Sequence, residues 1–231
     1  MNARSFVLTG MAAALLLSGT TLAASLDVVE FRRPMPVTGS IAAGKEKAQV
    51  CNNCHGANGK APVAMFPSVA GLPEQYLYWK LVEFKNSLRS DSIMTPLVAN
   101  NTIEDLRDIA VFYASLPLEV PSPLTPAPVD AARLERGRVL YLSGDPARGV
   151  PPCQGCHGTE GKGPDSAQPF QMAWPALYGQ QGEYVAWRLT NFQSGYAIDT
   201  TMDKIMQGVA RGLEPDDIAA LAAYVERLDG R

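Results

Sequence analysis

The stretch CNNCHGANGK at residues 51–60 occurs a second time, as CQGCHGTEGK, at residues 153–162. Each copy has two cysteines separated by two residues, a histidine directly after the second cysteine, and then glycine, two variable residues, glycine and lysine. The two copies use all 4 cysteines and both histidines of the 231-residue chain. This repetition predicts two functional sites of the same chemical type.

The similarity between the two halves of the chain extends well beyond these motifs. The paired segments are residues 66–87 with 174–195 and residues 103–116 with 214–228. In this alignment Pro67 pairs with Pro175, and Trp79 pairs with Trp187. Agreement over segments of this length predicts a duplicated domain.

A proline-rich segment separates the two copies. Residues 116–130, LPLEVPSPLTPAPVD, contain five prolines. Because proline fixes φ and has no backbone N–H, this segment is expected to be an extended connector rather than a helix. The expected boundaries are 40–118 for the first domain, 119–129 for the linker and 130–231 for the second domain.

The N-terminal segment has the layout of a secretory signal peptide. One early cation is followed by an apolar stretch over residues 6–17 and by small residues, which predicts a signal peptide at residues 1–24 with cleavage near Ala23 or Ala24. The alternative is a retained membrane anchor, but a spanning helix needs about 20 apolar residues. Residues 25–39 form a short arm without an assigned role. In a bacterium, the exported protein would lie in the periplasm.

Both halves are expected to be helical. Apolar residues recur at helical spacing, and no segment alternates as a strand would. Asp130 is expected to cap a helix that runs to Tyr141, and the corresponding helix of the first half is expected to start near Ser40. The fold class is therefore all-α, with about three short helices in each half. Such a thin core predicts that a bulky group fills each domain.

Three common roles of a CxxC pair explain the motif poorly. A thioredoxin-like redox site requires a βαβ context that is missing here. The two pairs of a zinc ribbon are separated by about 15–20 residues, whereas 98 residues lie between Cys54 and Cys153. Two local disulfides suit an exported protein. None of these roles uses the histidine that follows each pair, His55 or His157.

The pattern C-x-x-C-H has one well-defined purpose, the covalent attachment of haem c. Its two thiols add across the haem vinyl groups, and its histidine binds the iron. Two covalently attached haem c groups are therefore expected. Their predicted attachment and proximal residues are Cys51, Cys54 and His55 in the first half and Cys153, Cys156 and His157 in the second half.

The sixth iron ligand is expected to be methionine, because both histidines are already used. In the first half the candidate is Met94, in a loop expected to fold over the haem. In the second half Met202 and Met206 both qualify by position. Twelve residues separate Met94 from Leu106, and twelve also separate Met206 from Ile218, which favours Met206. The methionines assigned to packing or to the N-terminal arm are Met35, Met65 and Met172.

The paired motifs, the proline-rich linker and the segments GVPPCQGCHGTEGKG (149–163) and IMQGVARGLEPDDIAALAAYVERL (205–228) resemble the dihaem cytochrome c4 family. This resemblance implies two class I cytochrome c folds with His/Met irons. It also implies that the carbonyls of Pro67 and Pro175 accept the Nδ1–H of the haem histidines. The implied activity is periplasmic electron transfer from a quinol-oxidising cytochrome bc complex, or another donor, to a haem–copper oxidase.

Two rival functions are a dihaem peroxidase and a dihaem subunit of a dehydrogenase. A dihaem peroxidase needs an open or bis-histidine haem, which two histidines in total do not favour. A dihaem electron-accepting subunit of a periplasmic dehydrogenase, such as a sulfide-oxidising flavocytochrome, fits the same motifs. The net charge of −3 is mild and its charges are interspersed, so no nucleic-acid partner is expected. Five of the seven lysines lie in the first half, which is therefore expected to face an acidic partner.

Overall fold

The computed structural model describes residues 36–86, 92–118, 130–164, 174–196 and 200–228. The predicted signal peptide and linker lie outside these ranges, as do Met35 and Met172. The described residues before the linker are called the first half and those after it the second half. Within the described ranges no helix has the length and apolar character needed to cross a membrane.

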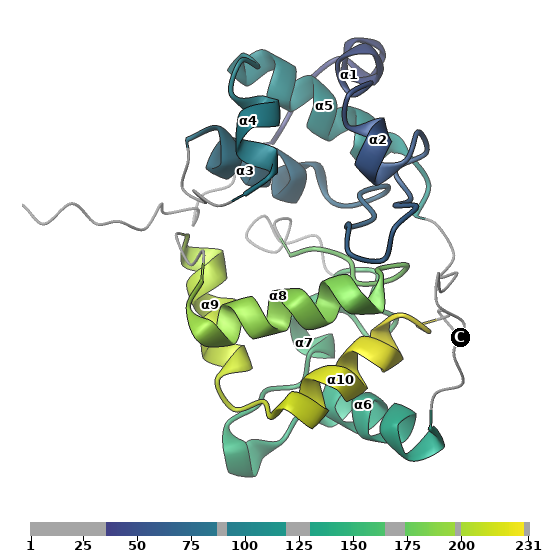
Figure 1. The fold of residues 1–231 in the computed structure, drawn as a ribbon, viewed down its shortest axis with the longest axis vertical. Helices are drawn as coiled ribbons and strands as arrows, with labels where there is room; N and C mark the ends of the chain where they lie inside the picture. Colours follow the sequence, from purple (N-terminus) through teal and green to yellow (C-terminus); the bar gives the residue numbers. More distant parts are fainter. Residues whose placement is uncertain (1–35, 87–91, 119–129, 165–173, 197–199, 229–231) are drawn as a thin grey trace, which may run out of the picture.

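The first half is helical, as predicted (Figure 1). Its helices are α1 (Ile41–Lys47), α2 (Asn52–His55), α3 (Glu74–Lys85), α4 (Met94–Val98) and α5 (Ile103–Ser115). Three helices were expected, and the two additional ones, α2 and α4, have only 4 and 5 residues. Helices this short leave almost no periodic signal in a sequence.

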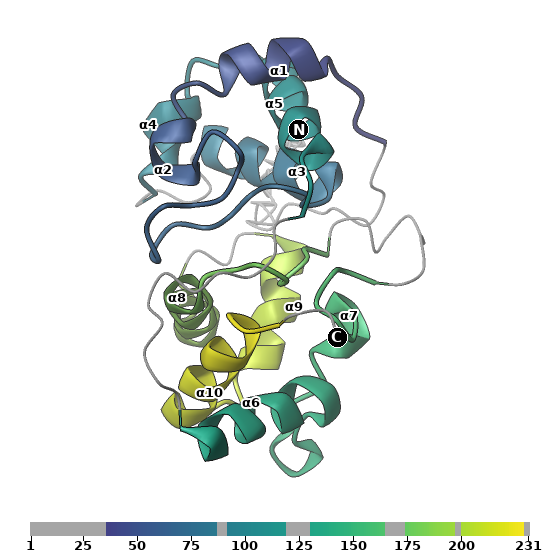
Figure 2. The same ribbon diagram turned by 90° about the vertical axis from the view of Figure 1, so that its right-hand side faces the viewer.

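The second half repeats this order of elements. It contains α6 (Ala131–Ser143), the 3-10 turn η1 (Pro146–Arg148), α7 (Gln154–His157), α8 (Gly182–Ser194), α9 (Thr201–Ala210) and α10 (Pro215–Val225). Seen from two directions, the halves lie one above the other as separate helical units (Figures 1 and 2). The all-α prediction is confirmed, and extended pairing in the described residues includes an isolated bridge between Asp145 and Val150.

The first helix of each half begins where the sequence predicted, and the predicted cap Asp130 is confirmed. Ser40 Oγ accepts a hydrogen bond from Ala43 N–H at 3.2 Å, and Asp130 Oδ1 accepts one from Ala132 N–H at 3.3 Å. Each side chain thus satisfies a backbone N–H that the helix itself leaves unpaired. Helix α6 runs two residues beyond its expected end at Tyr141.

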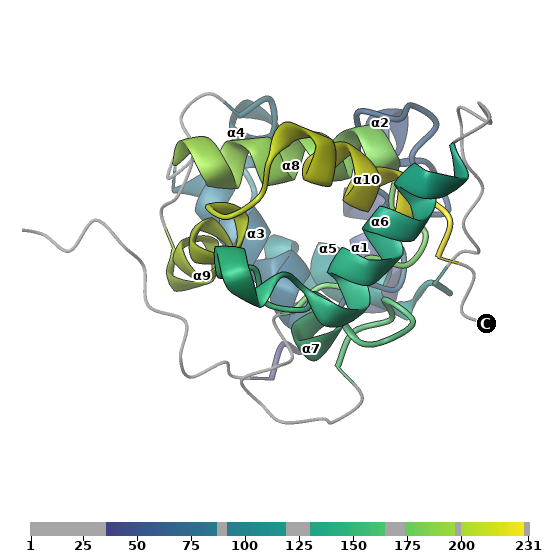
Figure 3. The ribbon, with the colours of Figure 1, turned by 90° about the horizontal axis from the view of Figure 1, so that it is seen from below.

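In each half the first and last helices cross at a glycine. A Cβ on Gly44 of α1 would overlap the backbone oxygen of Asp108 in α5, and a Cβ on Gly137 of α6 would overlap that of Ala220 in α10. These helix pairs have extensive contacts, and Figure 3 shows α6 beside α10. Neither glycine was predicted from the sequence: Gly44 lies 7 residues before Cys51, whereas Gly137 lies 16 residues before Cys153.

Each half has its own hydrophobic core, built on the inner face of its last helix. The first cluster contains Leu106, Ile109 and Phe112. The second cluster contains Ile218 and Leu221. The last helix of each half thus buries equivalent apolar residues on its inner face, and each CxxCH site packs against the core that they form.

Candidate haem sites

Each CxxCH motif forms one turn of helix. The N–H of His55 donates to the carbonyl of Cys51 at 2.9 Å, and the N–H of His157 donates to that of Cys153 at the same distance. The turn buries both histidine rings, while Cys156 is exposed. All four thiols are free, so the structure contains neither of the two local disulfides.

The glycine after each histidine turns the chain away from the motif. Gly56 and Gly158 have φ values of 77° and 79°, a region that favours glycine. A Cβ at Gly56 would meet the backbone oxygen of Lys60, and a Cβ at Gly158 would meet that of Gly163. The glycines that the two copies share are therefore required by backbone geometry.

Both histidine rings are oriented by a proline carbonyl. Nδ1 of His55 lies 2.9 Å from the oxygen of Pro67, and Nδ1 of His157 lies 2.8 Å from the oxygen of Pro175. Burial lowers the pKa of each histidine, and the hydrogen bond to the carbonyl opposes this effect. A neutral ring that donates from Nδ1 keeps the Nε2 lone pair for a metal.

The thiols do not form a zinc site. Cys153 packs against the second hydrophobic cluster, and burial raises the pKa of its thiol to about 11. Among the described residues, no three His, Cys, Asp or Glu side chains gather as a metal-binding group. The chemistry of the motif therefore fits thioether attachment to haem better than zinc binding.

A methionine packs against each core together with the first cysteine of the motif. Cys51 and Met94 contact the first cluster, and Cys153 and Met206 contact the second cluster. Met202 is half-buried one turn before Met206 in α9. Met65, assigned to packing at the haem edge, has 47% of its surface exposed.

The expectation that Met94 lies in a loop was wrong, because Met94 is the first residue of α4. Ser92 Oγ accepts a hydrogen bond from the N–H of Met94 at 3.1 Å. Pro96 falls in the first turn, where a helix tolerates proline. Helix α9 likewise includes Met206, and Thr200 caps it by accepting from Asp203 N–H at 3.1 Å.

A buried charge cluster lies between the halves. Lys80 of α3 contacts Glu83 at 2.8 Å and, across the boundary, Asp203 of α9 at 3.1 Å. Arg188 of α8 also reaches Asp203, at 3.5 Å. Burial by itself raises the pKa of Asp203, but the attraction of Lys80 and Arg188 keeps it below its usual value.

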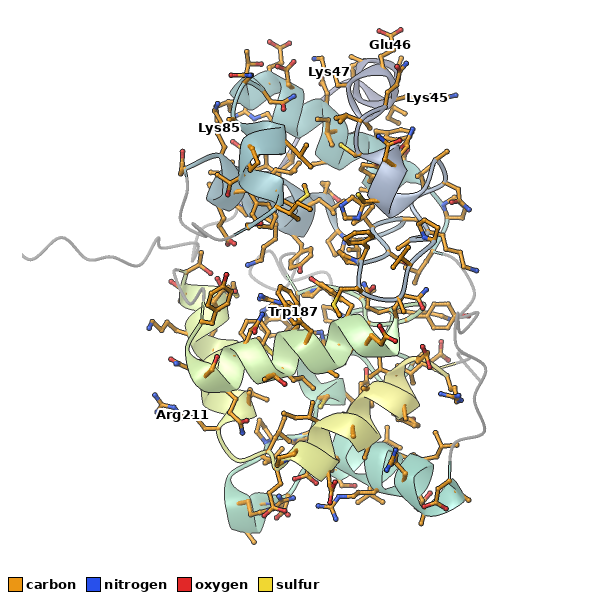
Figure 4. The ribbon with its side chains drawn as sticks, viewed as in Figure 1. Lys45, Glu46, Lys47, Lys85, Trp187 and Arg211 are labelled. Carbon is orange, nitrogen blue, oxygen red and sulfur yellow. The ribbon has the colours of Figure 1, made fainter. Side chains whose placement is uncertain are left out.

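The same cluster contains a buried donor that fits a haem propionate. Nη1 of Arg188 is buried and has no hydrogen-bond partner among the described residues, and such a group normally finds an acceptor. The carboxylates of a haem would supply one. Lys80 and Arg188 were not predicted from the sequence, although they occupy equivalent positions directly after Trp79 and Trp187. Figure 4 shows Trp187 on the side of α8 that faces the first half.

Comparisons with known proteins agree with this geometry. The cytochrome c family model matches residues 135–229. Cytochrome c4 of Pseudomonas aeruginosa is 38% identical over 190 residues, which cover 82% of this chain and 89% of that protein. The thiosulfate dehydrogenase electron acceptor of Thiomonas intermedia is 34% identical over 158 residues, 68% of each chain.

A solved structure gives the same result for the fold. The crystal structure of reduced recombinant cytochrome c4 from Pseudomonas stutzeri matches with a TM-score of 0.70 at 32% identity, covering 82% of this chain and 98% of that chain. This similarity extends over both halves. The chain therefore belongs to the cytochrome c4 family and is an electron-transfer protein with two cytochrome c domains and two haem c groups.

Proposed function

We propose that the protein carries electrons through the periplasm, from a quinol-oxidising cytochrome bc complex or another donor to a haem–copper oxidase. One observation supports this proposal most strongly. In both halves a buried, neutral histidine follows the CxxC pair and donates Nδ1–H to a proline carbonyl, at 2.9 and 2.8 Å. The duplicated geometry suits two haems of one type, each holding one electron.

The proposed ligand sets follow from the packing of each half. The first haem is attached to Cys51 and Cys54, and the second to Cys153 and Cys156. The proposed iron ligands are His55 and Met94 for the first haem and His157 and Met206 for the second. Pro67 and Pro175 orient the histidines. The proposed domains remain residues 40–118 and 130–231, joined by the linker 119–129.

This ligation explains why the function is electron transfer. When bound, a haem supplies reversible one-electron chemistry at its iron. With a histidine and a methionine as its protein ligands, the iron would have no open position for peroxide or oxygen. Methionine is a neutral, soft ligand that favours the ferrous state and raises the potential, which suits the oxidising end of a respiratory chain.

Export to the periplasm is part of the proposal. It is supported by the pattern of residues 1–24, which combines an early cation, an apolar stretch and small residues before Ala23 and Ala24. N-terminal sequencing of the purified protein tests the cleavage position.

A second candidate function is that of an electron-accepting subunit for a periplasmic dehydrogenase. It is favoured by a relative of 34% identity whose name is thiosulfate dehydrogenase electron acceptor. Reduction by a dehydrogenase much faster than by a cytochrome bc complex would support this role. Stable co-purification with such an enzyme would support it further.

The lysines of the first half contribute less to docking than their number suggests. Lys80 is directed into the boundary between the halves. Lys47 pairs with Asp105 and Asp108, each at 2.7 Å, at the outer end of the first half near Lys45 (Figure 4). We still propose an acidic partner for this half. Reduction rates that do not change with ionic strength would contradict it.

A redox titration of the purified protein tests the proposed function. Two one-electron steps are expected, with two haems per chain and the weak red absorption band of Met-ligated ferric haem. Rapid turnover of peroxide by the protein as isolated would contradict the proposal and favour a peroxidase.

A further inference from the structure

The two halves meet at the loop that carries Pro67. The N–H of Ser68 donates to Oε1 of Gln180 at 2.8 Å, and Nε2 of Gln180 donates to the oxygen of Ser68 at 3.0 Å. One side-chain amide of the second half thus binds both backbone groups of a single residue in the first half. Gln180 is only 6% exposed, so these hydrogen bonds are sheltered from water.

This contact is linked to His55 through one peptide group. The carbonyl of Pro67, which accepts from His55 Nδ1 at 2.9 Å, and the N–H of Ser68 belong to the same planar peptide unit. The resulting chain runs from Oε1 of Gln180 through this peptide to the imidazole. Hydrogen bonds in such a chain polarise one another. Gln180 therefore makes the oxygen of Pro67 a stronger acceptor.

The loop that carries Pro175 in the second half has no amide side chain at the corresponding position of the first half. The position equivalent to Gln180 is Leu72, whose side chain has no acceptor atom. Ala176, which follows Pro175, is 3% exposed and belongs to the same hydrophobic cluster as Leu72. The loop after Pro67 is therefore bound by an amide of the second half, whereas the residue after Pro175 packs against apolar side chains of the first half.

We propose that Gln180 is a positioning residue that lowers the reduction potential of the first haem selectively. This inference rests on the proposed ligation of the first iron by His55. A stronger hydrogen bond from Nδ1–H makes the imidazole a better electron donor at Nε2, which stabilises the ferric state. Docking of the second half thus separates the potentials of two sites that are otherwise built alike.

The variant that tests this proposal is Gln180→Met, which keeps the length of the side chain and removes its amide. The potential of one haem is expected to rise, while the other stays unchanged. In the diamagnetic reduced protein, the Nδ1–H resonance of His55 should shift upfield and exchange faster with solvent. The resonance of His157 should not move. The matched control is Leu72→Met, which should leave both resonances and both potentials unchanged.

A second variant, Gln180→Glu, tests whether the acceptor oxygen alone is responsible, rather than both hydrogen bonds between Gln180 and Ser68. It retains an oxygen for the N–H of Ser68, and because a carboxylate is at least as strong an acceptor as an amide, the His55 resonance is expected not to shift upfield. A His55 resonance that moves as far upfield in Gln180→Glu as in Gln180→Met would overturn the inference. So would a folded Gln180→Met protein in which neither the resonance nor either potential changes.

The wild-type protein distinguishes failure of this inference from failure of the proposed function. If it contains two Met-ligated haems and Gln180→Met changes nothing, the inference alone is wrong. If the wild type lacks His/Met ligation at the first iron, the proposed function fails and the inference fails with it.

Discussion

The two halves share the crossing of their first and last helices but stabilise it with different charges. Asp105 and Asp217 are equivalent residues near the start of α5 and α10, and both belong to capping boxes. Asp105 pairs with Lys47. Asp217 is fully buried and pairs with both Arg136 and Arg148.

This difference has a local cause. The second half carries the turn η1 between its first helix and its CxxCH motif, and that turn supplies Arg148. The histidine, the proline carbonyl and the crossing glycine are the same in both halves. Positions constrained by the haem or by backbone contact have thus stayed alike after duplication, while the ion pairs beside them have diverged.

The largest expected effect is at the helix crossings. Gly44→Ala and Gly137→Ala should each destabilise the protein by about 3 kcal/mol, because the added methyl group overlaps a backbone oxygen that only a helix shift can move. Urea unfolding of the haem-containing protein measures the loss. Gly155→Ala is the control, because nothing lies within 4 Å of its Cβ and the first motif has Asn53 there. An equal loss in the control would contradict the crossing as the cause.

A smaller effect is expected from the buried carboxylate of the second half. Asp217→Asn should cost about 2 kcal/mol, because it weakens the charged hydrogen bonds with Arg136 and Arg148, which are themselves partly exposed. Asp105→Asn should cost less, since Asp105 is partly exposed and pairs with a half-exposed lysine. Free energies of unfolding for the two variants give this comparison. Equal losses would mean that the two charge arrangements are equivalent.

The smallest effect is the pH dependence of the first-half pair. The hydrogen bond from Lys47, together with those from Thr102, lowers the pKa of Asp105 from 3.8 to about 2. Because the pKa is lower in the folded protein, the pair stabilises the fold above about pH 4 and this contribution is lost as the pH falls towards 2.

Comparison of wild type with Lys47→Met tests this dependence. The difference in their free energies of unfolding should be constant near neutral pH and should shrink between about pH 4 and 2. Lys45→Met, at an exposed neighbouring position, is the control and should show no such trend. A difference that persists unchanged at low pH would exclude Asp105 as the partner that matters.

Local sequence signals predicted much of the site. The motif specified the cysteine and histidine positions from their spacing alone. The predicted cap Asp130 and the predicted start near Ser40 both match the structure. The all-α fold followed from the helical spacing of apolar residues. Each of these features depends on residues that are close together in the chain.

Features formed between distant segments could not be predicted in this way. The contact of Gln180 with Ser68 spans 112 residues, and that of Lys80 with Asp203 spans 123. Neither leaves a local pattern. Glycine lowers helix propensity, so Gly44 reads as a weak helical position until its neighbour α5 is seen. Only comparison of the two halves offered a signal, since both crossings use glycine.

The proposed ligation is tested most directly by the red charge-transfer band of Met-ligated ferric haem. Met94→Ala and Met206→Ala should each remove about half of the band, because each removes one of two equivalent ligands. The double variant should lack it, and Met202→Ala should retain it in full. Loss of half the band in Met202→Ala, with a full band in Met206→Ala, would move the second ligand to Met202. A full band in the double variant would contradict methionine ligation by Met94 and Met206.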